Sequence, residues 1–119
     1  MKIAEGPIQL SFTIPCTPME AWQAFTVPAS MRGWFFPNIP DFRPEPGFQT
    51  QFVIENEGRT FTHLWTVLAA EKGRHLRLGW RYAEYLGDST IDFVFTDHPG
   101  GTSLTMHLRV LNDFTADVP

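Results

Sequence analysis

The stretch IQLSFTIPCTPMEAWQAF, residues 8–25, changes its hydrophobic period part-way along, and this change decides the expected fold. In its first part apolar and polar residues alternate, so Ile8, Leu10 and Phe12 fall on one face of an extended chain. Strict alternation of this kind is typical of a strand with one buried face. The sequence therefore predicts a half-buried strand at residues 8–14.

A helix is predicted directly after this strand. Thr17 is followed by Pro18 and, three residues after the threonine, by Glu20, which is the pattern of a capping box with proline in the first helical turn. Apolar residues then recur every three positions and give the helix an apolar face. Pro28 opens a second short helix, which ends before Pro37. Two short helices therefore follow the first strand.

The rest of the chain reads as a run of strands. The stretch PNIPDFRPEPG, residues 37–47, holds four prolines and predicts a rigid extended loop. Beyond it, strands are predicted at residues 48–55, 59–70, 75–82, 89–96 and 102–110. Short connections with turn residues separate these strands, so we expect neighbours along the chain to pair antiparallel. The strand at 59–70 is apolar on both faces, and the sequence leaves its orientation open.

Composition limits the class of protein. The 119 residues amount to a single domain, 1–119, large enough for one hydrophobic core. The net charge is -4 with no cluster of Lys or Arg, which argues against nucleic acid or an anionic membrane as the main partner. The single cysteine, Cys16, excludes an internal disulfide framework and fits a reducing compartment. Because no signal peptide precedes the first strand, we expect a cytoplasmic protein.

The predicted sheet lacks a cover. A six-stranded antiparallel sheet with one apolar face must bury that face against another layer, and two short helices suffice for only one end of it. The last stretch, RVLNDFTADVP at residues 109–119, does not have the pattern of a long amphipathic helix. We therefore expect an open apolar face, which a second copy or another protein would cover.

The order of these elements resembles the START-like, or SRPBCC, superfamily with its helix-grip fold. The closest resemblance is to the domain named after the activator of heat-shock protein 90 ATPase. It rests on IPCTPMEAWQAFT, on VPASMRGWF, on the PEPG turn and on GTSLTMHL in the last strand. The resemblance implies an α+β fold with a six-stranded antiparallel sheet and two short helices after strand 1. In that family a long C-terminal helix and the sheet enclose an apolar cavity; here this helix is absent or truncated.

The resemblance suggests three functions. The first is non-enzymatic binding of a small hydrophobic ligand in the apolar cavity or groove, without a cofactor. The second is a protein–protein module of the co-chaperone type, and the third is a cyclase- or hydrolase-like enzyme acting on a hydrophobic substrate. The residues expected to line the cavity are Trp34, Phe35, Phe52, His63, Trp65, Trp80, Tyr82, Phe93 and Met106, with Arg32 as a polar group that orients the ligand.

Histidines are the main candidates for chemistry. The spacing of His63, His75, His98 and His107 matches no compact metal site, and no catalytic constellation is evident, so we expect neither metal nor catalytic residues. His63 shares its strand face with large apolar residues and is expected to face the cavity, whereas the other three and Asp92 are expected to face solvent. An inward His63 beside a second polar group would favour an enzyme; an outward one would count against it.

Overall fold

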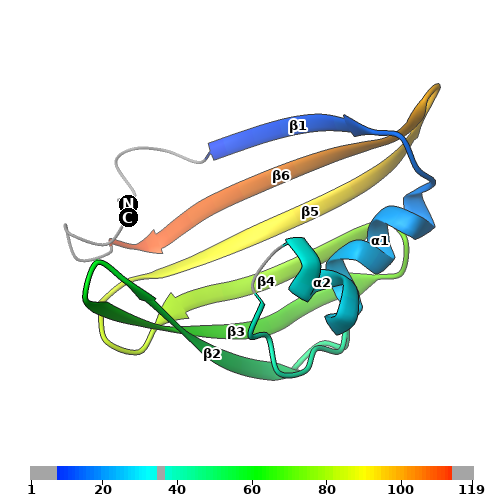
Figure 1. The fold of residues 1–119 in the computed structure, drawn as a ribbon. Coiled ribbons are helices and arrows are strands. Elements are labelled where there is room, and N and C mark those ends of the chain that lie inside the picture. The colour runs from blue at the N-terminus through cyan, green and yellow to red at the C-terminus, as the bar shows by residue number, and fades with distance from the viewer. Residues whose placement is uncertain (1–7, 35–36, 114–119) are drawn as a thin grey trace.

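The structure, a computed structural model, describes residues 8–34 and 37–113, without the side chain of Trp34. Six antiparallel strands form one open sheet in the order β1-β6-β5-β4-β3-β2, with two short helices against one face (Figure 1). The elements are β1 Ile8–Ile14, α1 Pro18–Thr26, α2 Pro28–Trp34, β2 Gln49–Asn56, β3 Arg59–Glu71, β4 His75–Tyr82, β5 Asp88–His98 and β6 Gly101–Asn112. The predicted α+β helix-grip fold is confirmed, and every strand lies within two residues of its predicted ends.

The capping box predicted for α1 is present. The Thr17 hydroxyl accepts a hydrogen bond from the Glu20 amide at 3.2 Å, and the Glu20 carboxylate accepts one from the Thr17 amide at 3.1 Å. These two bonds satisfy backbone donors that a helix start leaves unpaired. They fix the place where α1 begins, and so the direction in which its apolar face meets the sheet.

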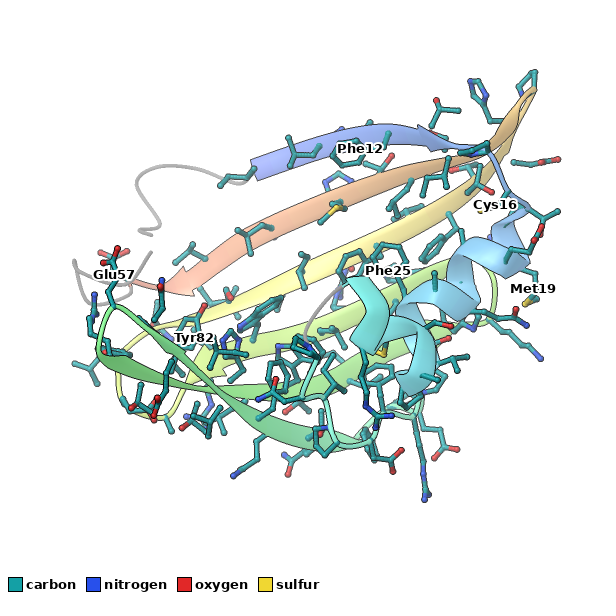
Figure 2. All side chains as sticks on the ribbon, viewed as in Figure 1. Phe12, Cys16, Met19, Phe25, Glu57 and Tyr82 are labelled. Carbon is teal, nitrogen blue, oxygen red and sulfur yellow. The ribbon has the colours of Figure 1, made fainter. Side chains whose placement is uncertain are left out.

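Aromatic side chains of α1 anchor the helix to the sheet. Phe25 packs on Phe93 of β5 with ring centroids 4.9 Å apart, and Trp22 meets Phe95 edge to face at 5.9 Å. Figure 2 shows Phe25 pointing from the helix onto the strands beneath it. We call the side of the sheet that α1 covers the inner face and the opposite side the outer face.

The structure settles the orientation of β3, which the sequence left open. Phe61, His63, Trp65 and Val67 point to the inner face and are buried, while Leu68 is 47% exposed. The pairing with β4 shifts between Val67 and Ala69, so one extra residue sits in this strand as a β-bulge. The alternation therefore restarts after Leu68, and the apolar pattern on both faces arises partly from this shift.

The pairing of β1 with β6 joins the first and the last of the described strands. All other pairs are between strands adjacent in sequence, whereas β1 reaches across to the last strand, with Leu10 opposite Met106 and Phe12 opposite Leu104. The helices lie over the other strands, so the β1 end of the inner face is uncovered in the described part of the chain (Figure 1). Among the described residues, no helix is long and apolar enough to cross a membrane.

Candidate functional site

A row of half-exposed apolar side chains marks the uncovered end of the inner face. Ile8, Leu10 and Phe12 of β1 are 45%, 51% and 50% exposed, and they lie opposite Leu108, Met106 and Leu104 of β6. Figure 2 shows Phe12 on β1, at one edge of the sheet. We call Ile8, Leu10, Phe12, Met106 and Leu108 the inner strip. Met106 and Leu108 are only partly buried and pack against the core, so the strip continues the core outward to water.

Aromatic rings form the floor of the inner face beyond the strip. Phe52 and the His63 ring are stacked, with centroids 4.9 Å apart and planes 9° apart. Trp65 meets Phe52 edge to face at 4.9 Å and Trp80 at 5.0 Å, and Tyr82 meets His63 edge to face at 4.9 Å. Edge-to-face contacts of this kind add about 0.5–1.5 kcal/mol per pair beyond simple burial. Five of the residues predicted from the sequence therefore form one contiguous cluster.

His63 lies within this cluster and points inward, as the strand pattern predicted. It is 6% exposed, and its Nδ1 atom accepts a hydrogen bond from the Trp80 indole N–H at 3.2 Å. Since an indole nitrogen only donates, this bond places the ring proton of neutral His63 on Nε2. Burial lowers the pKa of His63 to about 4, although the nearby carboxylate of Glu84 opposes this shift. His63 is therefore a neutral side chain near pH 7.

The neutral state of His63 predicts a pH dependence of stability. Between pH 4 and the usual histidine pKa of 6.5, the unfolded chain binds a proton that the folded chain does not. Stability at this site is therefore complete above pH 6.5 and falls as the pH drops towards 4, by an amount on the order of 3 kcal/mol. We expect His63→Gln to flatten this part of the curve in urea unfolding measured from pH 4.5 to 7.5. A slope unchanged by the substitution would contradict the assignment.

The remaining predicted residues fall in different places. Phe93 is 1% exposed and packs under α1, and Met106 belongs to the inner strip. Arg32 donates hydrogen bonds to the carbonyl oxygens of Ile39 and Pro40, both at 2.7 Å, and so holds the proline-rich loop against α2. The predictions for the Trp34 side chain and for Phe35 lie outside the described residues.

Asp92 is less exposed than the sequence suggested. Its side chain is 16% exposed, because His75 and Arg77 close over it from β4. One carboxylate oxygen, Oδ1, lies 2.6 Å from Nε2 of His75 and accepts a hydrogen bond from Nε of Arg77 at 2.8 Å. Burial opposes ionisation of Asp92, but the two hydrogen bonds together with the positive charge of the side chains that make them outweigh burial and lower the pKa of the carboxyl group. The His75 side chain is likewise only 22% exposed, which corrects the expectation that it faces solvent.

No metal centre emerges from the side chains that the structure describes. Within residues 8–34 and 37–113, no group of three or more His, Cys, Asp or Glu residues is placed to hold a metal ion. The strand pattern could identify His63 as inward, because alternation fixes the side of a strand. It could not identify the outer-face cluster around Asp92, since cross-strand neighbours depend on the register.

Residues 15–117 match the sequence family described as Activator of Hsp90 ATPase homolog 1-like protein. The chain belongs to this family. Its members' START-like fold accounts for the open sheet and the two helices after β1. Membership supports a ligand-binding or interaction domain in general terms.

Solved structures agree with membership of the Activator of Hsp90 ATPase homolog 1-like family. A protein from Rhodobacter sphaeroides is 25% identical with a TM-score of 0.77, and the alignment covers 89% of this chain and 73% of that one. Protein MLL2253 from Mesorhizobium loti is 26% identical with a TM-score of 0.74, covering 89% and 77%. Mll3558 from Rhizobium loti shares the fold with a TM-score of 0.82 at 17% identity, covering 96% and 83%. No curated protein matches the chain.

Proposed function

We propose that this domain binds a small hydrophobic molecule on the inner face of its sheet, without catalysing a reaction and without a cofactor. The inner strip carries this proposal. Three large apolar side chains in a row, Ile8, Leu10 and Phe12, are each about half exposed, although the same face is fully packed a few strands away. An apolar ligand laid over them would remove this surface from water at about 25 cal/mol per Å². Beyond β5, the rigid rings on β2, β3 and β4 would limit how far the ligand extends across the same face.

The residues that the sequence predicted to line the cavity would contribute in two ways. Phe52, Trp65 and Phe93 are almost fully buried and would shape the floor from below. Trp80, Tyr82 and Met106 are partly exposed and would touch the ligand itself. His63, as a neutral group, and Arg32, at the edge of the loop, would supply polarity that orients the ligand. We place the protein in the cytoplasm, on the ground of its single cysteine.

A protein partner is the second candidate, because the same strip also fits a protein surface. β1 is an edge strand whose exposed apolar row lacks charged residues, which is unusual for an unprotected sheet edge. A second copy or another protein that covered the strip would bury the same side chains. This interpretation agrees with the interaction role that the family description suggests.

An enzyme is the third candidate. His63 is inward and adjoins the Trp80 N–H, which meets one condition set for that interpretation. With a pKa of about 4, however, His63 is a weak base, and its Nδ1 atom already accepts the Trp80 hydrogen bond. General bases work best with pKa values near the working pH. We therefore favour binding over catalysis.

Binding of cis-parinaric acid, whose fluorescence rises in an apolar site, tests the proposal. We expect saturable binding to the unmodified protein and at least about tenfold weaker binding to Leu10→Asn, since a buried amide without a partner opposes an apolar ligand. Val53→Asn is the matched control, because Val53 is 46% exposed on the outer face. Equal weakening by both substitutions, or no saturable binding, would contradict the proposal. Native mass spectrometry of the same samples separates the partner candidate, which predicts a dimer that Leu10→Asn dissociates.

A further inference from the structure

The outer face carries a hollow that the proposed function does not use. A shallow groove of about 730 Å³ crosses it from Gln9 on β1 to Leu68 on β3, and a second hollow of about 290 Å³ adjoins it. The two share Leu68, Thr90 and Leu111 in their linings. We call the two together the outer groove. Its lining comes from five neighbouring strands, so its length across the sheet is about 19 Å at about 4.8 Å per strand.

The floor of the outer groove is low because of Gly79. This glycine pairs with Thr90, and Thr90 pairs with Arg109 on the next strand. A Cβ atom at Gly79 would come within 3.7 Å of the Leu68 side chain, so a larger residue would fill the hollow between β3 and β5. Arg77 and Arg81 flank the glycine along β4, because side chains two residues apart share a face of a strand. Two arginines therefore flank the low point of the sheet on β4, and a third, Arg109, lies two strands away on β6.

The charges of the outer groove are not balanced. Asp92 is paired with Arg77 and lies against His75, whereas Asp88 accepts a hydrogen bond only from the neutral Ser89 amide and keeps its negative charge. The side chains of Arg81 and Arg109 are exposed and make no hydrogen bond or ion pair with other described residues. The lining of the outer groove therefore has three arginines against two aspartates, a small positive excess on a chain whose net charge is -4. Complementary charge is what directs a partner to such a region.

We propose that the outer groove binds an extended acidic peptide segment of a partner protein, with Arg81 and Arg109 pairing its carboxylates. The shallow, open form of the groove suits an extended chain, and its length matches about six residues at about 3.3 Å each. Leu68 and Leu111 line both hollows, are 47% and 44% exposed, and provide contacts for apolar side chains of the peptide. Arginine matches a carboxylate with two parallel N–H donors, which favours a peptide rich in Glu or Asp.

Fluorescence anisotropy with a fluorescein-labelled hexapeptide of sequence ELEELE tests this proposal on the whole chain. We expect saturable binding that weakens between ~0.05 M and ~0.3 M salt, because exposed charge pairs are screened. Arg81→Gln with Arg109→Gln is expected to weaken binding about five- to tenfold, whereas Asp92→Asn is expected to strengthen it a few-fold by releasing Arg77. Arg43→Gln removes an exposed arginine in the proline-rich loop and is expected to change nothing. Circular dichroism confirms that each variant is folded.

Several results would overturn the proposal. If a peptide with glutamine in place of glutamate bound with equal affinity, the negative charges of the peptide would not contribute to its recognition. Loss of binding in Arg43→Gln equal to that in the double variant would assign the effect to overall charge. Displacement of the peptide by millimolar inorganic phosphate at constant ionic strength would show a site for small anions instead. Leu10→Asn leaves the outer face intact, so its effect on this binding is expected to be nil whatever it does to the inner strip.

Discussion

Trp65→Ala is expected to lower the free energy of unfolding by about 3–5 kcal/mol, the usual loss for a large aromatic residue in a core. Trp65 is 1% exposed and lies at the centre of the inner face. Its ring meets Phe42 of the loop, Phe52 of β2 and Trp80 of β4 edge to face, so one truncation opens a cavity between three parts of the chain. Domains of this size are stable by about 5–15 kcal/mol in total, so the loss is a large fraction.

Leu68→Ala is the matched control for this substitution. Leu68 lies three residues along the same strand, but it is 47% exposed on the outer face, so we expect its truncation to cost less than about 1 kcal/mol. Guanidinium unfolding followed by circular dichroism gives both values. Similar losses for the two variants would mean that Trp65 is not the packing centre described above.

Gly101→Ala is expected to be the most damaging change of a single methyl group, at roughly 2–6 kcal/mol. Gly101 begins β6 with φ of +143°, a backbone conformation that side chains rarely adopt. A Cβ atom there would lie 2.0 Å from the carbonyl oxygen of Ile14 and 3.0 Å from the amide nitrogen of Cys16. The neighbouring Thr102 donates its hydroxyl proton to the carbonyl oxygen of Cys16 at 2.7 Å, so this turn holds the junction of β1 and α1.

Substitution of the adjacent glycine separates the cost of backbone strain from the cost of the steric clash. Gly100 has φ of +151°, but a Cβ atom there would meet nothing within 4 Å. We therefore expect Gly100→Ala to cost only the backbone strain of about 1–3 kcal/mol. The difference between the two variants, measured as thermal and denaturant midpoints, is the cost of pushing β1 away. Equal losses of stability in the two variants would show that the close approach of Ile14 to this turn adds nothing to the cost of the Gly101 substitution.

The helices and strands could be predicted because their signals are local. Thr17, Pro18 and Glu20 are sufficient to start α1, and alternation over residues 8–14 is sufficient to define β1 and its apolar face. The orientation of β3 depends on a bulge near Leu68 and on which neighbours pair with it, which no local pattern contains. The sequence therefore predicted where β3 runs but not which of its faces is buried.

In the candidate site, too, some features follow from local patterns in the sequence and others depend on contacts between strands. Alternation predicted that His63 points inward, and the structure adds the Trp80 hydrogen bond that fixes its tautomer. Arg32 was expected to orient a ligand, yet it also binds two loop carbonyls, a contact that depends on the path of residues 37–47. Asp92 was expected in solvent because its strand neighbours are apolar; its true surroundings come from β4. The sequence pattern could not predict these contacts between neighbouring strands.

Because β1 pairs with β6, the two strands of this pair are synthesised at widely separated times on the ribosome. β1 is the first described strand to be made and its partner is the last, and the roughly 90 residues between them take on the order of 5–20 s at about 5–20 residues per second. During that delay β2 to β5 can form hairpins with neighbours already made, whereas β1 has none. The nascent chain therefore leaves Ile8, Leu10 and Phe12 fully in water until Gly101–Asn112 emerges, and about half of their surface stays exposed after β1 and β6 have paired.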